Sequence, residues 1–312
     1  MDISVIIPVR NGQDYLKQCL DSVFNQTFKG SYEVILGIDP SSDDTLKIAK
    51  EYQKDHPNLI VEERRGLGVQ YNRIDSIKKA KGKYLCFLDG DDYYHETFLE
   101  KMFSEIEKGY EVVNCSFRVD TNGKLKNNLF SKNVELDSCG ACKALLQDSY
   151  VRGFLWNKIF KKELFENKLP IFKAKDAMFE DVMVVYTIFS RCNKVKSIKD
   201  PLYIYRNNGA SATKSEKKER FKYHLFVFAY IRYLCDLNND KKYLYDYIKT
   251  FKRSKLSLWY DAHVSRHVLG NGGCKELRRH KQIIDELRSK QPFSIDKYPK
   301  IKQFIENSLD GE

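Results

Sequence analysis

The sequence predicts an α/β fold, in which a mostly parallel sheet carries flanking helices and a helical appendage follows at the C-terminal end. Over the first 90 residues, short apolar runs alternate with amphipathic segments four times. Continuous apolar runs are typical of parallel strands buried on both faces, and such strands are joined by crossover helices. After residue 212 no strong strand pattern occurs. The 312 residues therefore predict a sheet-based domain over 1–212 and a helical region over 213–312.

The first elements follow a regular order. The run 3–7 is apolar and β-branched and stops at Pro8, which predicts a buried strand. Between 13 and 26, apolar side chains recur at helical spacing and predict an amphipathic helix. The alternation continues with strands expected at 33–38, 59–61 and 83–88, and with helices expected from the Ser- and Asp-rich segment 39–43 to about 54 and over 69–81.

The rhythm changes after residue 92. We expect a strand at 111–119, a polar loop at 121–132 and an extended segment at 195–205. The remaining patterns indicate helices, which are expected at 97–108, 139–148, 179–190, 220–237, 243–267 and 275–289, with a break at Asn271-Gly-Gly.

Positive charge is concentrated in the last third of the chain. The net charge is +11, of which residues 1–210 carry +2 and residues 211–312 carry +9. A basic segment suggests an anionic partner, such as nucleic acid, an anionic membrane surface or a phosphorylated substrate. A solvated lysine-rich helical surface explains the same charge, and contact with a second copy of the chain is a further option. The sequence alone does not decide between these interpretations of the basic region.

No apolar run reaches the roughly 18 residues that a membrane-spanning helix needs. The N-terminal residues have an acid at Asp2 and only a short apolar stretch before Pro8, unlike a secretory signal peptide. We therefore expect a cytoplasmic protein, with peripheral attachment to the inner face of the membrane as an option for the basic region.

An acidic turn is the most informative local feature. The apolar run 83–88 leads directly into Asp89-Gly90-Asp91-Asp92. Ligands of an open parallel sheet bind at the carboxyl ends of its strands, and crowded carboxylates repel one another unless a cation neutralises them. Oxygen ligands in small number suit Mg²⁺ or Mn²⁺, which keep places for water and substrate phosphates. The alternative is a solvated turn with incidental acids.

Two common phosphate-binding motifs are missing. No G-x-G-x-x-G follows the first expected strand, and no G-x-x-x-x-G-K-[ST] occurs anywhere. If a nucleotide binds, its phosphates must be held by the metal and by basic side chains.

The order of motifs resembles the family 2 glycosyltransferases, inverting enzymes with the Rossmann-like GT-A fold. The matching segments, in order, are Val5–Asn11, Leu20–Thr27, Ile38–Thr45, Gly68–Ile74, Phe87–Asp92, Trp156–Phe160, Glu180-Asp181 and Tyr205-Arg206 followed by Ser211. The resemblance covers about residues 1–212. The chain departs from the family pattern at Arg10, Ile38, Ile74 and Asn208, where an aromatic residue, Asp, Asn and His are usual.

The resemblance implies a role for each matching residue. The nucleotide-sugar donor, expected to be a UDP-sugar, would contact Pro8, Val9, Asn11, Asp39, Arg73, Asp89, Gly90 and Asp91. Asp91 and Asp92 would hold Mn²⁺ or Mg²⁺, and Asp181 beside Glu180 would act as the catalytic base. Structural alternatives exist for three of these positions: a helix N-cap at Asp39, a surface ion pair at Arg73 and acids that match a helix dipole at Glu180-Asp181.

These observations suggest three hypotheses for the function. The leading hypothesis is an inverting, metal-dependent transfer of a sugar from a nucleotide-sugar to a glycan, polymer or protein acceptor. A nucleic-acid-binding protein that uses the basic C-terminal helices is the main alternative, but it leaves the acidic turn unexplained because carboxylates repel phosphate backbones. A non-catalytic scaffold with the same fold is the third, and the intact Asp91, Asp92 and Asp181 argue against it.

Overall fold

The structure is a computed structural model that describes residues 1–166, 170, 180–207, 227–234, 236, 283, 285–287, 289 and 293–309. Its strands are β1 (Ile3–Val9), β2 (Tyr32–Ile38), β3 (Leu59–Glu63), β4 (Tyr84–Phe87), β5 (Tyr93–Tyr94), β6 (Val112–Thr121), β7 (Lys124–Asn128), β8 (Val134–Leu136), β9 (Lys158–Lys161) and β10 (Val195–Arg206). Its helices are α1 (Leu16–Phe24), α2 (Thr45–Asp55), α3 (Val69–Lys79), α4 (Phe98–Ile106), α5 (Ser138–Leu146), α6 (Glu180–Phe189) and α11 (Pro299–Leu309), with 3₁₀ turns at Lys162–Phe165 and Ile295–Lys297.

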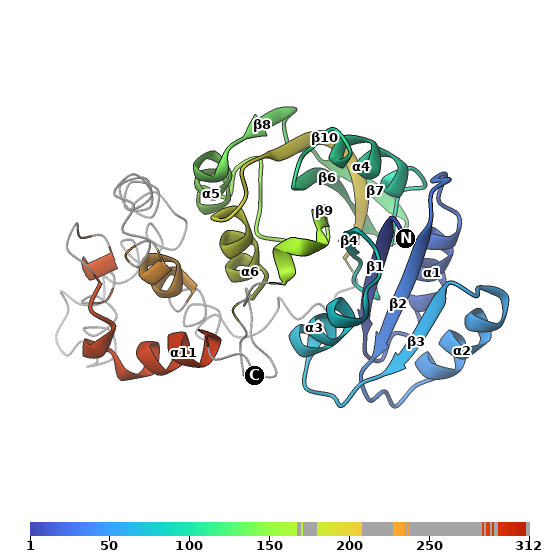
Figure 1. Cartoon of the computed structure of the whole chain (residues 1–312). Helices are drawn as coiled ribbons and strands as arrows, with labels where there is room; N and C mark the ends of the chain where they lie inside the picture. The colour runs from blue at the N-terminus through green and yellow to red at the C-terminus, as the bar shows by residue number, and fades with distance from the viewer. Residues whose placement is uncertain are drawn as a thin grey trace.

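One sheet runs through the described part in the order β3-β2-β1-β4-β9-β6-β10-β5 (Figure 1). Strands β1 to β4 pair in parallel, as expected from the alternating pattern. Strand β9 enters antiparallel between β4 and β6, so the second half of the sheet is mixed rather than parallel. The α/β class with flanking helices is confirmed.

Alternate side chains of the strands point into two apolar layers. Ile6, Leu85 and Phe87 lie in one buried cluster, which also takes in residues of α5 and α6. Val5, Ile7 and Cys86 lie in the other, together with residues of α1, α2 and α4. Because both faces bury apolar residues, the strands read as unbroken apolar runs, and helices cover the sheet on both sides (Figure 1).

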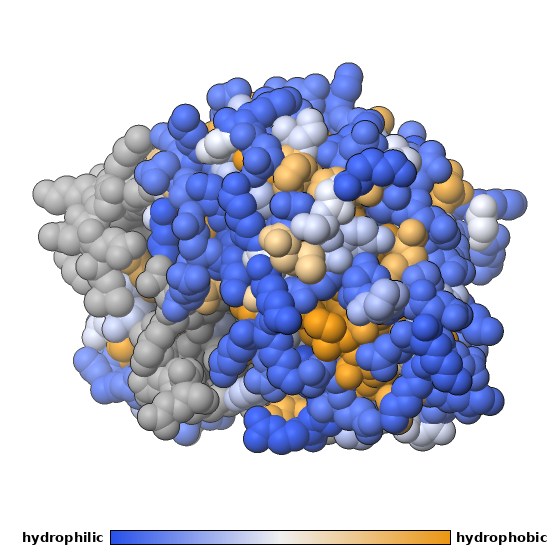
Figure 2. Space-filling view, turned by 45° about the vertical axis from the view of Figure 1, so that its right-hand side comes forward, coloured by the Kyte–Doolittle hydropathy of each residue, from blue (hydrophilic) through white to orange (hydrophobic). Residues whose placement is uncertain are grey.

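Figure 2 shows a mostly hydrophilic surface with several apolar areas between the hydrophilic ones. Among the described residues, the exposed large apolar side chains are Met1, Leu67, Leu125 and Leu129. No helix in the described ranges is both long and apolar enough to cross a membrane.

Four strands of the described sheet, β5, β7, β8 and β9, were not expected. The segment 121–132, expected as a polar loop, contains strand β7, which forms a hairpin with β6. Its two-residue turn is Asn122-Gly123, and both residues have positive φ (52° and 82°), which is the backbone that such tight hairpins need. Strand β9 was not expected as a strand, because its four residues include two lysines and show no apolar run.

The described residues after 212 pack against α6. Val227, Tyr230 and Leu287 belong to the same buried cluster as Met183 and Val185 of α6. The Tyr230 hydroxyl lies 3.3 Å from Thr187 Oγ1. The expected helix 220–237 is helical over its described residues 227–234 and 236, and 275–289 over 283 and 285–287. The expected helix 243–267 and the break at Asn271-Gly-Gly lie outside the described residues, and α11 was not expected.

Candidate active site at the strand ends

The acidic turn lies directly against the end of β1. A Cβ atom at Gly90 would lie 2.7 Å from Val9 Cγ2 and 3.3 Å from the carbonyl oxygen of Pro8. Real Cβ atoms do not approach that closely, so only glycine permits this contact. The structure therefore brings Pro8, Val9 and Gly90 together, three residues that the sequence assigned to one site. Pro8 does not end the strand, because β1 continues to Val9 and β4 stops before it could pair with Pro8.

Asp39 follows β2 and lies at the same edge of the sheet. Its backbone N–H donates to the carbonyl oxygen of Val9 (2.9 Å). Its side chain does not cap α2, which begins six residues later and whose first residue, Thr45, donates to Asp43 instead. The helix-cap alternative for Asp39 is therefore wrong. Asp39 is buried, and its Oδ1 has no hydrogen-bond partner in the described part of the chain. An orphaned buried acceptor of this kind is a candidate to receive an N–H from a ligand.

Asn11 ties the loop after β1 to the loop after β2. It has a positive φ of 49°, its Oδ1 accepts from the N–H of Ser42 (2.9 Å), and its own N–H donates to Ser41 Oγ (3.0 Å). Asn11 thus frames the region beside Asp39 through its contacts with the second loop.

Arg73 connects three carboxylates from different parts of the chain. Its guanidinium lies 2.8 Å from Asp89 Oδ1, 2.7 Å from Asp181 Oδ1 and 3.4 Å from Glu180 Oε1. The arginine is 6% exposed, so the surface ion-pair alternative is wrong. Burial lowers the pKa of Arg73, but the three acids outweigh burial and hold the pKa above its ordinary value. Arg73 thereby joins α3, the acidic turn and the start of α6 at one point.

Asp181 and Glu180 begin α6 and lie half-buried beside this arginine. Asp181 Oδ2 accepts from the N–H of Leu155 (3.3 Å), which fixes the second oxygen. Burial raises the pKa of Asp181, and Arg73 opposes that rise only in part. Burial also raises the pKa of Glu180, with the charge of Asp181 as the next cause. The acid pair is therefore a better proton acceptor than an exposed carboxylate would be.

Asp92 is the buried member of the acidic turn, and its expected role as a metal ligand stays a prediction. It is 1% exposed; its Oδ2 accepts from the Tyr203 hydroxyl (2.6 Å) and its Oδ1 from the N–H of Arg206 (2.7 Å). Burial, followed by the charges of Asp91 and Asp89, raises the pKa of Asp92 well above the ordinary value. Both oxygens are used inside the protein, so Asp92 anchors the turn. Asp91, like Asp89, is half-buried.

The described residues contain no cluster of three or more His, Cys, Asp or Glu side chains that could hold a metal ion alone. The carboxylates of the acidic turn nevertheless fit a cation such as Mg²⁺ or Mn²⁺. Such a cation binds through one or two carboxylates and completes its shell with substrate phosphates and water. Asp91 and Asp92 are the carboxylates expected in that role, and Asp91 is the more exposed of the two.

Sequence reasoning missed several residues that shape the site. Tyr203 and Arg206 on β10 hold the acidic turn, and Lys158 on β9 donates to the carbonyl oxygens of Arg152 (2.7 Å) and Phe154 (2.6 Å), next to the Leu155 N–H that binds Asp181. The motif segments Trp156–Phe160 and Tyr205-Arg206 marked this region without revealing the contacts. Trp156 is 5% exposed and stacked between Phe154 and Tyr203, so it belongs to the core.

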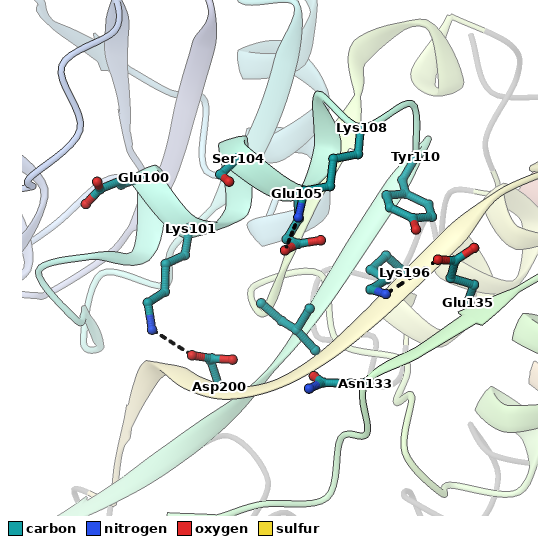
Figure 3. A pocket seen from close by; sticks show the side chains of 11 residues that line it. Glu100, Lys101, Ser104, Glu105, Lys108, Tyr110, Asn133, Glu135, Lys196 and Asp200 are labelled. Carbon is teal, nitrogen blue, oxygen red and sulfur yellow. Dashed lines mark hydrogen bonds and ion pairs between the residues drawn. The ribbon is translucent and has the colours of Figure 1, made fainter.

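A separate cavity of about 640 Å³ lies between α4, β8 and the first half of β10 (Figure 3). Its lysines are paired with acids: Lys101 with Asp200 (2.6 Å), Lys108 with Glu105 (2.7 Å) and Lys196 with Glu135 (3.7 Å). This cavity lies at the opposite end of β10 from Tyr203 and Arg206 and contains none of the expected site residues.

The same N-terminal region of the chain matches known proteins. The sequence model of the family described as Glycosyl transferase family 2 matches residues 4–172. The chain is 27% identical over 231 residues to the uncharacterized glycosyltransferase EpsJ of Bacillus subtilis (strain 168), which covers 72% of this chain and 66% of that protein. It is 30% identical over 210 residues to a poly(ribitol-phosphate) beta-glucosyltransferase of Bacillus spizizenii, over 66% of this chain and 32% of that protein. The match thus spans about two thirds of EpsJ and a third of the second relative.

Among solved structures, residues 1–349 of S. aureus TarS in complex with UDP-GlcNAc share this fold with a TM-score of 0.66 at 16% identity. The match covers 92% of this chain and 90% of that one. The GT-A fold expected from the motifs is therefore confirmed.

Proposed function

The chain belongs to glycosyl transferase family 2 and is a glycosyltransferase, and on that premise we propose that it transfers a sugar from a UDP-sugar to a hydroxyl group of a glycan or polymer acceptor, with inversion at the anomeric carbon. One observation carries the proposal: Arg73 holds the half-buried Asp181 beside Asp89 at the carboxyl ends of the strands. A proton acceptor and a donor-binding turn thereby occupy one site. The UDP-GlcNAc complex of TarS supports the choice of donor class.

The residues divide the work of the reaction. Asp39 Oδ1, which has no partner among the described residues, accepts the imide N–H of uracil, and Pro8, Val9 and Asn11 line the base pocket. Asp89 and Gly90 bring the turn close to the ribose and diphosphate. A divalent cation held by Asp91 would neutralise the negative charge of the diphosphate. Asp92 is the second expected ligand, and the hydrogen bonds from Tyr203 and Arg206 to its two oxygens hold it in the turn.

Asp181 acts as the base of the transfer, and Glu180 supports it. As the acceptor oxygen forms its bond to the anomeric carbon, the bond from that carbon to the diphosphate oxygen breaks and UDP leaves. The hydroxyl proton passes to a carboxylate oxygen of Asp181. Arg73 orients this carboxylate and, through its charge, lowers its pKa against the effect of burial. Attack on the face opposite the leaving group gives inversion.

The acceptor is proposed as a glycan or polyol-phosphate polymer, because one relative is a poly(ribitol-phosphate) beta-glucosyltransferase. A protein acceptor, attachment to an anionic membrane surface through the basic C-terminal region and self-association are options that acceptor screening and light scattering would separate. Nucleic acid is not proposed, because the described site presents carboxylates.

The test is a panel of nucleotide-sugars assayed for UDP release with Mn²⁺ and with EDTA. We expect turnover of a UDP-sugar with the metal only. Asp181→Asn should lower kcat at least about 100-fold while the Kd for UDP stays within about twofold, because the amide keeps the shape and loses the basicity. Asp55→Asn, an exposed acid at the end of α2, is the matched control. Full turnover in Asp181→Asn, or weaker UDP binding with unchanged kcat, would rule out the base role.

A further inference from the structure

The acidic turn is held from the far end of β10 by one arginine. Arg206 Nε donates to the carbonyl oxygen of Asp91 (2.8 Å), and the backbone N–H of Arg206 donates to Asp92 Oδ1 (2.7 Å). Two consecutive residues of the turn are therefore tied to the same residue of β10. The contact to Asp91 is to its main chain, so it fixes the backbone from which the Asp91 side chain extends.

The guanidinium is itself firmly oriented. Its NH2 donates to Gln18 Oε1 on α1 (2.6 Å), and its NH1 lies 3.8 Å from Asp120 Oδ2 on β6. Its centre lies 4.8 Å from the ring of Tyr15 and 5.1 Å from the ring of Tyr93, within the range of cation–π attraction. Contacts from α1, β5 and β6 thus hold the plane of the guanidinium in one direction.

We propose that Arg206 is a positioning residue for donor binding: it holds the Asp91 backbone so that the Asp91 carboxylate meets the cation and diphosphate of the donor. This inference rests on the proposed function, because it assigns Arg206 to the metal-dependent part of UDP-sugar binding. Arg206 touches neither substrate nor cation in this role. It acts through the turn.

The planar fork of arginine is what the arrangement requires. The bond to Asp91 uses Nε, and the bond to Gln18 uses NH2, two donors at a fixed angle. A lysine has a single ammonium group on a flexible stem and cannot supply both bonds in that geometry. Arg206→Lys therefore keeps the charge and removes the orientation.

A purely structural role makes a different prediction from a positioning role. Loss of general stability would weaken UDP binding with and without metal alike. Loss of Asp91 orientation weakens only the gain that the metal brings, because the uracil contacts at Asp39 and Asn11 lie on other loops. The two roles are therefore separated by comparing UDP binding in Mn²⁺ with UDP binding in EDTA.

The experiment is calorimetric titration of the full chain with UDP, in Mn²⁺ and in EDTA, for wild type, Arg206→Lys and Arg206→Met. We expect wild type to bind UDP more tightly with Mn²⁺. Arg206→Lys should lose about tenfold of the affinity in Mn²⁺ and almost none in EDTA, as expected for one charge-assisted hydrogen bond. A higher Mn²⁺ concentration should restore part of the loss. Lys101→Met is the control. It removes the ion pair with Asp200, which lies on β10 like Arg206 but away from the acidic turn.

Each other outcome decides the matter. If wild type shows tighter binding with Mn²⁺ and Arg206→Lys shows the same gain, the inference is wrong and the proposed function stands. If wild type binds UDP equally in Mn²⁺ and EDTA, the metal-dependent donor site is wrong, and this inference with it. Should both Arg206 variants fail to fold, Gln18→Leu is the alternative variant. Gln18 is an exposed residue of α1, and this change removes the hydrogen bond that the Arg206 guanidinium donates to it. It should then show a smaller loss confined to Mn²⁺, and an unchanged gain would overturn the inference.

Discussion

Arg73 and Asp181 are 108 residues apart in the chain and form an ion pair at 2.7 Å. The pair connects α3, which follows the third strand, to the first turn of α6. It also fixes what each residue can do. Arg73 binds carboxylates inside the protein and does not extend to the surface. Asp181 accepts from Arg73 with one oxygen and from the Leu155 N–H with the other.

Arg73→Met is expected to destabilise the protein and abolish transfer. Without the arginine, Asp89, Glu180 and Asp181 lose the cation that pairs with all three of them, and Glu180 and Asp181 are half-buried. Removing one partner of a buried ion pair typically costs about 3–5 kcal/mol of unfolding free energy. Denaturant titration measures the loss, and Arg65→Met, an exposed arginine before the same helix, is the control. A variant as stable as wild type would show that the three acids are accommodated by other means.

Gly90→Ala is expected to weaken donor binding through a steric effect. The added methyl group would lie 2.7 Å from Val9 Cγ2, so the acidic turn must move away from the end of β1. Overpacking of this kind costs about 1–3 kcal/mol of stability. The KM for the donor should rise more than kcat falls, since the turn and the base pocket lose their alignment.

Gly140→Ala on α5 is the control for that change, because its Cβ would lie 3.0 Å from a side-chain oxygen outside the site. Steady-state kinetics of both variants decide the case. Equal KM values for Gly90→Ala and wild type would show that the turn does not contact the donor.

Some of this site could be predicted from local sequence and some could not. The polar residues after β1, β2 and β4 follow buried strands, and parallel pairing brings such ends to one edge, so Asn11, Asp39 and Asp89 were placed by a general rule. The position of Asp181 came from family resemblance. Its contact with Arg73 depends on how α6 packs, which no local pattern encodes.

The role of Asp92 shows why residue type alone is insufficient. Asp91 and Asp92 are adjacent acids with the same local context, and the sequence treats them alike. The structure separates them because Tyr203, 111 residues later, donates to Asp92. Strand β9 was not predicted for a related reason. It is a strand because it pairs with β4 and β6, whereas Lys158 and Lys161 interrupt the apolar run by which a buried strand is recognised in the sequence.

Lys158→Met is expected to change how stability depends on pH. Burial lowers the pKa of Lys158 from 10.5 to about 7. Between these values the unfolded chain binds the proton more tightly than the folded protein does, so the free energy of unfolding rises with pH across that window. The contribution of one proton is about 1.4 kcal/mol per pH unit, and it vanishes below pH 7, where Lys158 is protonated in both states.

Denaturant titrations from pH 6 to 10 test this by comparison of two curves (a range set by the pKa near 7). The wild-type curve should be steeper than that of Lys158→Met, while groups shared by both proteins cancel. Lys162→Met is the control, because Lys162 also donates to a carbonyl oxygen (Ala80, 2.6 Å) but is half-buried. Parallel curves would mean that the three oxygen acceptors of Lys158 keep its ammonium group charged when folded.

Removal of residues 213–312 tests the proposed boundary at residue 212 and the role of the basic region. Tyr230, Val227 and Leu287 share a buried cluster with α6, which carries the proposed base Asp181 at its first turn. Arg232 is fully buried and donates to Asp236 and to the carbonyl oxygens of Leu287 and Ser289, so the region has an ordered interior of its own. We expect a chain that ends after residue 212 to melt at least about 5 °C lower, because α6 then exposes apolar surface.

The same truncation should impair transfer more than UDP binding. The proposed uracil-binding residues lie on loops after β1 and β2, far along the chain from α6, whereas Asp181 depends on α6 staying in place. A chain that ends after Leu309 keeps α11 and serves as the control. If the 1–212 chain keeps both its melting temperature and its transfer to a small acceptor, the basic region is a separate module. Transfer to an anionic polymer that then falls as salt rises would assign that module to electrostatic docking, since screening shortens from about 10 Å at 0.1 M to about 3 Å at 1 M salt.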